Sequence, residues 1–406
     1  MPLMKVSLAD VEAARGTLAK LLEPTPLLPN RWLSERLGCQ VFLKLENMQP
    51  IGSFKIRGAT YKIARLSAAQ RRKGVITASA GNHAQGVAWG CAQFKTKATI
   101  VMPVNAPLTK VQNTAALGAH IVLCGDNYDE AHAHARKLAA KSGAVFVHPY
   151  EDVDVIAGQG TVGLEIIEQL PEVDCVIGSM GGGGLMAGVG TVIKEFKPKT
   201  LVVGAQASGA RSLIESIKRG KPFSTGQADT FADGIKVKTA SAAMVKILKP
   251  LLDVVTHADD EATAAAVLTL MEKAKVVAEG AGALPLAVLE RLTARLRGKK
   301  VVLIVSGGNI DVNVLSRIID RGLILAGRRV RLNVFITDRP GSLNRLTGLI
   351  AEKGANILQA IHDRDSPSAG IGETSVELTV ETRGPEYSRE LIEALGRHVA
   401  RLEVLH

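Results

Sequence analysis

Short apolar segments alternate with segments of helical periodicity through most of the chain. The apolar segments are residues 41–43, 99–102, 120–123, 145–147, 175–177, 201–203 and 301–305. Short buried strands separated by helices predict an α/β fold, with a mainly parallel sheet covered on both faces. Ligands bind beyond the carboxyl ends of the strands in such sheets. Gly81, Gly181 and Ser306 each lie just after, or close to, one of these ends.

The pattern changes near Arg328. Residues 330–336 and 374–382 alternate apolar and polar positions, as half-buried strands do. The turn Asp338–Ser342 is expected to place Ser342 at a helix N-cap. With helices before Gly354 and over 386–395, and a last strand at 402–405, the order β-α-β-β-α-β predicts a ferredoxin-like unit. We therefore expect one domain over residues 1–327 and a second over 328–406.

Composition narrows the classes of molecule that the protein is expected to bind. The chain has 406 residues, a formal net charge of +11 and 3% aromatic residues. Base stacking needs aromatic side chains, and no long Lys/Arg run is present, so no nucleic-acid partner is expected. The four cysteines lie far apart, which fits reduced thiols. No apolar run is long enough to span a membrane, so we expect a cytoplasmic protein without a membrane partner.

Lys55 is the first candidate for chemistry. It lies in Gly52-Ser-Phe-Lys-Ile-Arg-Gly-Ala59, between small and apolar residues and with no carboxylate beside it. Desolvation lowers the pKa of such a lysine, and its neutral amine can form a Schiff base with an aldehyde. Enzymes hold pyridoxal phosphate in this way. Taken alone, a lysine of this kind is more often a surface residue before a helix.

Four consecutive glycines, Gly181–Gly184, are the second candidate. They follow the strand at 175–177 and precede an apolar helical run over 185–193. Consecutive glycines let several backbone N–H groups converge, and a helix N-terminus adds positive potential, so this loop predicts a phosphate site. No Gly-Lys-Ser/Thr ending follows, which excludes a nucleotide-triphosphate loop. A flexible turn is the alternative.

Four segments together resemble the fold-type II pyridoxal-phosphate enzymes, and most closely the threonine/serine dehydratases, also called threonine ammonia-lyases. They are, in the family's order, Lys44–Ala59, Ser79–His83, Gly181–Leu185 and Ser306–Asn309. The resemblance covers about residues 5–325. It implies a tryptophan synthase β-like fold of two parallel-sheet lobes, with the cofactor between them and the smaller lobe at about residues 46–150.

The resemblance also assigns the cofactor contacts. Lys55 would carry pyridoxal phosphate and later serve as the base for the substrate's α-proton. Asn82 would bind the phenolic oxygen and Ser306 the pyridine nitrogen. A hydroxyl at Ser306 does not force the ring to be cationic, which suits β-elimination more than transamination. The remaining cofactor contacts would be Phe54, Gly181, Gly182, Gly183, Gly184 and Leu185.

The substrate carboxylate would be held, by the same resemblance, by the segment Ser79, Ala80, Gly81, Asn82 and His83. Glu279, in a segment that matches a family stretch near the cofactor, is a candidate proton-handling group. A helix-start glutamate near the N-terminal dipole is the alternative for Glu279. The segment Phe231–Lys236 resembles a loop near which some relatives bind a metal ion, but no ligands can be assigned, so a metal stays open.

Two patterns resemble ligand-binding motifs but are interpreted as structural. Gly158–Gly163 fits Gly-x-Gly-x-x-Gly, but the charged segment 152–157 makes a poor strand and no ribose-binding acid follows at the right distance, which disfavours a dinucleotide. His132 and His134 are spaced i, i+2 on a predicted helix, so their rings do not face each other. They are expected to form a solvated face and not a zinc site.

The function expected from the resemblance is conversion of L-threonine to 2-oxobutanoate and ammonia, and of L-serine to pyruvate. Serine racemases carry a serine where this chain has Ala80, which disfavours racemisation, although Ser79 is adjacent. Other fold-type II reactions and a non-catalytic amino-acid sensor are the remaining alternatives. Whether the role is biosynthetic, towards isoleucine, or catabolic stays open.

The C-terminal module resembles an ACT regulatory domain. Relatives with such a domain bind an amino acid at a domain interface, and Asn356 and the segment His362–Asp365 are candidate contacts for an effector. A module used only for assembly is the alternative. A homo-oligomer, dimer or tetramer, is expected.

Overall fold

The computed structural model describes residues 5–405. The chain divides into two compact units, residues 1–310 and 311–406. The division falls before the helix α15 (Val312–Leu325), whereas the sequence pattern places it after this helix, between residues 327 and 328. Among residues 5–405, no helix has both the length and the apolar character that crossing a membrane requires.

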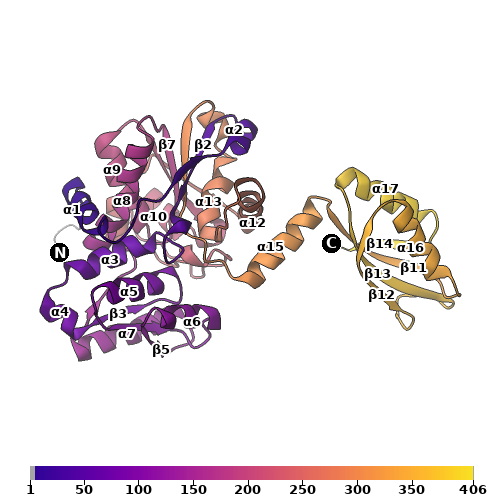
Figure 1. Ribbon diagram of the computed structural model, residues 1–406, viewed down its shortest axis with the longest axis horizontal. Helices are drawn as coiled ribbons and strands as arrows, with labels where there is room; N and C mark the ends of the chain where they lie inside the picture. The colour runs from indigo at the N-terminus through magenta and orange to yellow at the C-terminus, as the bar shows by residue number, and fades with distance from the viewer. Residues whose placement is uncertain (1–4, 406) are drawn as a thin grey trace. The chain divides into compact units, whose positions relative to one another are not determined.

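A six-stranded sheet forms the centre of the first unit (Figure 1). Its order is β1-β2-β10-β7-β8-β9; β1 runs antiparallel to β2, and the other described neighbours are parallel. Strand β7 is buried along its whole length, as its unbroken apolar run predicts. The strands are β1 (Leu27–Pro29), β2 (Gln40–Leu45), β7 (Cys175–Ser179), β8 (Leu201–Ala207), β9 (Val254–Ala258) and β10 (Lys300–Val305).

A second, parallel sheet is inserted in the sequence between β2 and β7. Its order is β5-β4-β3-β6. The strands are β3 (Val75–Ala78), β4 (Ala98–Met102), β5 (His120–Leu123) and β6 (Val145–Phe146). The chain thus passes from the larger sheet to the smaller one after β2 and returns before β7. One mainly parallel sheet and one parallel sheet, with helices around them, confirm the predicted α/β class with two lobes.

Helices cover both sheets of the first unit (Figure 1). They are α1 (Leu8–Leu18), α2 (Arg31–Leu37), α3 (Lys55–Arg65), α4 (Ala68–Lys73), α5 (Asn82–Gln93), α6 (Leu108–Ala116), α7 (Tyr128–Ser142), α8 (Val153–Gln169), α9 (Gly184–Phe196), α10 (Ser212–Arg219), α11 (Ala242–Leu248), α12 (Asp260–Thr269), α13 (Gly280–Leu289) and α14 (Thr293–Leu296). Single turns occur at η1 (Glu46–Met48), η2 (Ser208–Ala210), η3 (Asp233–Ile235) and η4 (Leu270–Ala274).

The glycines of the Gly158–Gly163 pattern lie inside α8, where they allow neighbouring helices to approach closely. A Cβ at Gly158 would lie 2.6 Å from the Cα of Gly58 in α3. A Cβ at Gly188 in α9 would lie 2.5 Å from the nitrogen of Gly160. Helix packing therefore explains the pattern without a dinucleotide, which binds at a strand-to-helix turn and not inside a helix.

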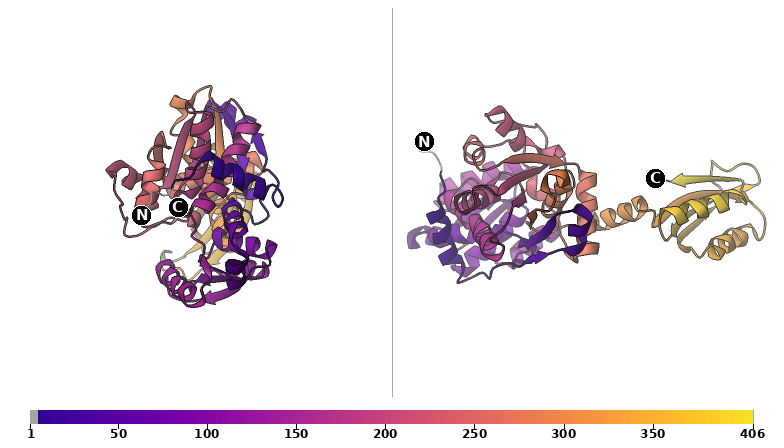
Figure 2. Two further views of the ribbon diagram at one scale, coloured as in Figure 1. Left: turned by 90° about the vertical axis from the view of Figure 1, so that its left-hand side faces the viewer. Right: turned by 90° about the horizontal axis from the view of Figure 1, so that it is seen from above.

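The second unit contains a four-stranded antiparallel sheet of order β12-β13-β11-β14. Helix α15 precedes this sheet in the sequence, and the helices α16 and α17 lie on one face of it (Figure 2). From β11 onwards the predicted β-α-β-β-α-β order is confirmed. The elements are β11 (Arg329–Thr337), α16 (Ser342–Glu352), β12 (Asn356–Asp363), β13 (Glu373–Glu381), α17 (Pro385–Gly396) and β14 (Arg401–Leu405).

The start of α16 departs from the sequence expectation. Gly341 is the N-cap of α16, and its φ of +86° makes the entry turn that only glycine adopts readily. Ser342 is therefore the first helical residue, and the predicted Ser342 cap was wrong. The Ser342 hydroxyl lies instead 3.1 Å from Thr337 Oγ1.

Four buried charges join the start of α3 to the rest of the first unit. Arg57 Nε donates to Glu46 at 2.7 Å, and Arg57 Nη1 donates to Glu165 in α8 at 2.5 Å. Lys44 Nζ in β2 donates to the same Glu165 carboxylate at 2.6 Å. Lys44 and Glu46 are 0% exposed and Arg57 is 2% exposed. Two positive and two negative side chains leave the cluster neutral, and each partner offsets the desolvation of the others.

Replacing Arg57 by Leu should destabilise the first unit strongly. Removal of one member of a buried ion pair leaves an unpaired buried charge, here on Glu46, because Glu165 keeps Lys44 as a partner. Such a loss typically costs about 3–5 kcal/mol in the free energy of unfolding. Urea denaturation followed by circular dichroism measures the change. Arg31→Leu is the matched control, because the pair Arg31–Glu35 is 91% and 63% exposed and its loss should leave the midpoint unchanged. Equal midpoints for the two variants would contradict this role of Arg57.

Candidate active site

The segments that carry Lys55 and Ser306 are hydrogen-bonded to each other. The backbone N–H of Phe54 donates to the Ser306 carbonyl at 3.0 Å, and that of Gly308 donates to the Gly52 carbonyl at 2.9 Å. Strands β2 and β10, which precede these segments, are parallel neighbours. Both segments therefore leave the sheet at the same edge, and the sheet brings Lys55 and Ser306 together.

A chain of side-chain hydrogen bonds adds two further segments to this edge. Asn309 Nδ2 donates to Asn82 Oδ1, and Asn82 Nδ2 donates to Glu279 Oε1, each at 2.8 Å. The same Asn309 amide donates to the Ile51 carbonyl at 2.8 Å. A side-chain amide has two N–H groups, so Asn82 keeps one for a ligand. The expected site residues Asn82 and Glu279 thus lie in direct contact, although 197 positions separate them.

Lys55 opens helix α3 with its amine in a part-buried site. Its Nζ donates to the Pro149 carbonyl at 2.8 Å and lies 5.3 Å from the centre of the Phe54 ring. Within residues 5–405, no carboxylate forms an ion pair with it. Burial lowers the pKa of Lys55 to about 8, and the more distant charge of Glu279 opposes the shift. The neutral form of the amine is therefore far more populated near neutral pH than in an ordinary lysine.

Glu279 is the N-cap residue of α13, but its side chain does not cap that helix. The carboxylate turns instead towards Asn82. Burial raises the pKa of Glu279 to about 7, opposed by the hydrogen bond from Asn82. Glu279 thus occupies the helix start, and its carboxyl group can also gain or lose a proton near neutral pH.

The glycine loop follows β7 and ends at the N-terminus of α9. Gly183 has φ +91°, which favours glycine. A Cβ at Gly182 would lie 2.3 Å from the ring of Tyr150, so this position must be glycine to admit the ring. Leu185 is 3% exposed and packs in the core. Its side chain therefore faces away from any ligand, and only its backbone N–H can contribute to a phosphate site.

The segment Ser79–His83 precedes and opens α5 at the end of β3. Ser79 Oγ accepts from the backbone N–H of Gly81 at 3.2 Å, and Ala80 is half-buried. His83 Nε2 lies 3.2 Å from the Val147 carbonyl, so this nitrogen carries the proton and donates. Burial, followed by the charge of Lys55, lowers the pKa of His83 to about 3. Its imidazole is neutral, and a carboxylate could receive a hydrogen bond only from its backbone.

Comparison with known proteins assigns the family. Residues 18–307 match the family described as "Pyridoxal-phosphate dependent enzyme", and residues 330–395 match the ACT domain family. This chain belongs to the pyridoxal-phosphate dependent enzymes. The enzyme is 46% identical over 387 residues to the L-threonine ammonia-lyase of Thermotoga maritima, which covers 95% of this chain and 96% of the relative.

Two solved structures are similar to more than three quarters of the enzyme. Threonine deaminase isoform 2 from Solanum lycopersicum superimposes with a TM-score of 0.74 at 36% identity, over 77% of this chain and 91% of that chain. Maize serine racemase superimposes with a TM-score of 0.74 at 33% identity, over 79% of this chain and 98% of that chain.

The residues of the enzyme fit its cofactor. Strands β7 and β10 are parallel neighbours, so the glycine loop after β7 and Ser306 after β10 lie at one edge together with Lys55. The buried Nδ1 of His83 has no hydrogen-bond partner in the described part of the chain, which indicates a polar site that a ligand can complete. A lysine amine of lowered pKa, a glycine loop at a helix N-terminus and a buried hydroxyl match the aldehyde, phosphate and ring nitrogen of pyridoxal phosphate.

Sequence reasoning missed the turn His148–Tyr150. It contacts Lys55 through Pro149 and the glycine loop through Tyr150. The available signal was its place after strand β6, because carboxyl ends of parallel strands carry functional groups. The pair Lys110–Asp233 was also missed: it joins α6 of the smaller lobe to η3 of the larger lobe at 2.8 Å.

The expectation of a solvated face at His132 was wrong. The His132 ring is half-buried and lies 5.2 Å from the ring of Phe146 and 6.3 Å from that of His148. Helix α7 turns this side of its surface towards β6, so aromatic packing replaces solvent. Among residues 5–405, no three His, Cys, Asp or Glu side chains are grouped as metal ligands would be.

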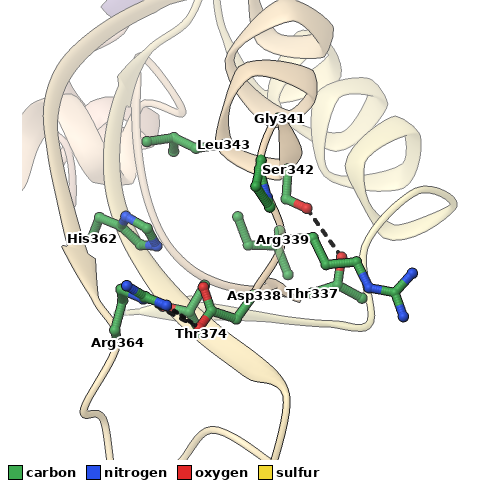
Figure 3. Close-up of a pocket in the computed structure, with 11 residues that line it drawn as sticks. Thr337, Asp338, Arg339, Gly341, Ser342, Leu343, His362, Arg364 and Thr374 are labelled. Atoms are coloured by element: carbon green, nitrogen blue, oxygen red, sulfur yellow. Dashed lines mark hydrogen bonds and ion pairs between the residues drawn. The ribbon is translucent and has the colours of Figure 1, made fainter.

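A pocket with a volume of about 450 Å³ lies in the ACT domain (Figure 3). The turn before α16 forms one side and β12 forms the other. Across it, Arg364 donates to Asp338 at 2.6 Å. His362 and Arg364 line the pocket, as the sequence suggested for that segment, whereas Asn356 does not and donates instead to Glu381 at 3.4 Å.

The reactivity of Lys55 should reveal its lowered pKa. In cofactor-free protein, the acetylation rate of Lys55 should be half-maximal near pH 8, because the neutral amine is the reactive form. Brief acetylation at a series of pH values, with peptide mass spectrometry, measures this rate, and the exposed Lys221 reports the reactivity of the reagent. A Lys55 rate that rises with a midpoint at the ordinary value of 10.5 would contradict the burial argument.

Proposed function

We propose that this chain is an L-threonine ammonia-lyase, which converts L-threonine to 2-oxobutanoate and ammonia and L-serine to pyruvate and ammonia. The observation that carries the proposal is the 46% identity to the Thermotoga maritima L-threonine ammonia-lyase over 95% of the chain. A relative in Geobacter sulfurreducens with the same name is 43% identical over a similar length. Both matches include the ACT part, so the two-domain organisation is shared.

The proposed roles are those that the family resemblance assigns, supported by the arrangement of the residues. The N–H groups of Gly181–Gly184 and Leu185 would bind the phosphate, Asn82 the phenolic oxygen and Ser306 the ring nitrogen, and Phe54 packs beside Lys55. When bound, pyridoxal phosphate withdraws electrons from the substrate's α-carbon and so acidifies its proton. The Lys55 amine, with its lowered pKa, accepts that proton.

The substrate carboxylate is assigned to the Ser79–His83 segment, chiefly through backbone N–H groups at the start of α5. Glu279, held by Asn82, is the second proton-handling group. Its raised pKa suits a group that exchanges a proton near neutral pH. We assign catalysis to residues 1–327, with a smaller lobe at about residues 46–150, and regulation to residues 328–406.

Racemisation is the close alternative within the fold, given the likeness to maize serine racemase. Ala80 presents no acid where a racemase would need a second proton donor, which favours elimination. Chiral analysis of L-serine after incubation distinguishes the two reactions.

The Lys55→Ala variant should lose turnover of L-threonine by about a thousandfold, because both the tether and the α-proton base are removed. The measurement is formation of 2-oxobutanoate, with the visible absorbance of the cofactor recorded in parallel. Lys62→Ala, about two helical turns further along α3, is the control and should keep activity. A parent protein that binds the cofactor yet makes no 2-oxo acid from threonine or serine would refute the lyase assignment.

We also propose that the ACT pocket binds an amino-acid effector. The ion pair Asp338–Arg364 is the supporting observation, because a carboxylate can compete for Arg364 and an ammonium group for Asp338. The pocket's hydroxyl groups, from Thr337 and Ser342, add hydrogen-bonding capacity.

Calorimetry with the full-length enzyme should show binding of isoleucine or valine, and Arg364→Ala should weaken it by about tenfold or more, as loss of a charged hydrogen bond does. Serine and threonine are tested for comparison, since they can also bind the catalytic site. Arg397→Ala changes an exposed arginine outside the pocket and should leave binding intact. Absence of any heat change with isoleucine and valine would rule out this effector class.

A homo-oligomer and a cytoplasmic location complete the proposal. The exposed apolar side chains Leu358 and Ile361 on β12, each 47% exposed, support self-association. All four cysteines are unpaired, which fits a reducing compartment.

A further inference from the structure

The turn after β6 is organised by one imidazole. His148 Nδ1 accepts hydrogen bonds from the backbone N–H of Glu151 at 2.8 Å and from that of Tyr150 at 3.4 Å. The acceptor thus serves the residues two and three positions later, which is the pattern of an Asx turn. Here a histidine ring nitrogen takes the place of an asparagine or aspartate oxygen.

This geometry requires a neutral His148. With two donors directed at Nδ1, the single proton of the ring lies on Nε2. Burial, followed by the charges of His132, Lys55 and Arg136, lowers the pKa of His148 to about 4. The imidazole therefore stays an acceptor throughout the neutral range.

Both proposed cofactor anchors contact this turn. The Pro149 carbonyl accepts from Lys55 Nζ at 2.8 Å. The Tyr150 ring lies against Gly182, and the Tyr150 backbone lies beside Gly184, where a Cβ would be 3.1 Å from the Tyr150 Cα. A shift of residues 149–151 would therefore move the partner of the lysine and the packing of the phosphate loop at the same time.

We propose that His148 is a positioning residue. Its Nδ1 holds the turn 149–151 and so fixes the position of the Lys55 amine relative to the glycine loop. The proposal rests on the proposed function only in taking Lys55 and Gly181–Gly184 as the cofactor anchors. His148 touches neither anchor through a hydrogen bond of its own; it acts through Pro149 and Tyr150.

Ring packing is the competing explanation for His148. Its ring belongs to a cluster with Tyr128, His132, Phe146 and Tyr150, and lies 4.6 Å from the Tyr150 ring at nearly a right angle. Variants can separate the two roles. His148→Phe keeps an aromatic ring and loses the acceptor. His148→Asn loses the ring and keeps an acceptor of Asx-turn type. His132→Ala removes the neighbouring imidazole and leaves the acceptor in place.

The test compares these variants in the full-length enzyme by hydrogen exchange at the Tyr150 and Glu151 amides and by cofactor titration through visible absorbance. His148→Phe should exchange these amides about tenfold faster and bind pyridoxal phosphate about tenfold more weakly, as loss of backbone hydrogen bonds predicts. His148→Asn should stay within about threefold of the parent in both measurements, and His132→Ala should resemble the parent.

Two results would overturn the proposal: a His148→Phe variant equal to the parent, or a His148→Asn variant as impaired as His148→Phe. If His148→Phe does not fold, His148→Asn against His148→Ala, both lacking the ring, decides the same question. The exchange measurement needs no bound cofactor. A parent that fails to bind pyridoxal phosphate would therefore refute the proposed function, while the exchange rates still decide the role of His148.

Discussion

A neutral cluster of four buried charges is the constraint on which the site depends. Arg57 lies two positions after Lys55, and its guanidinium is held by Glu46 and Glu165. Because an unpaired charge in this environment is so unfavourable, α3 has one allowed placement relative to β2 and α8. The position of the Lys55 backbone follows from that placement. The side chain then needs only the Pro149 carbonyl to orient its amine.

The protonation behaviour of the site follows from the burial of Lys55 and Glu279. The pKa of Lys55 falls to about 8 and that of Glu279 rises to about 7, so desolvation brings an ordinarily basic group and an ordinarily acidic group close to the same pH. The attraction between their charges opposes both shifts but does not cancel them. Two groups that can each hold or release a proton near neutrality therefore lie at one sheet edge, as proton transfer at a carbon atom requires.

Most of the fold and the four motif segments could be predicted from the sequence. Unbroken apolar runs such as 301–305 and the alternation over 330–336 are local signals, and the structure confirms the strands they predict. Contacts between distant segments leave no such signal. The hydrogen bonds of Asn309 with Asn82, and of His148 with its own turn, depend on how the lobes meet. The aromatic packing of His132 was missed for the same reason, since helical spacing identifies a face and not its neighbour.

The insertion of the smaller sheet has a mechanical consequence. The chain enters that lobe through the segment before α3 and leaves it through the segment between β6 and α8. Lys55 follows directly after the first of these segments. The second segment contains Pro149, whose carbonyl accepts a hydrogen bond from Lys55, and Tyr150, whose ring packs against Gly182 of the glycine loop. Any rotation of one lobe relative to the other would change the backbone of these two connecting segments. Such a rotation would therefore move Lys55 and the residues packed on the glycine loop together, so the two proposed cofactor anchors are mechanically coupled.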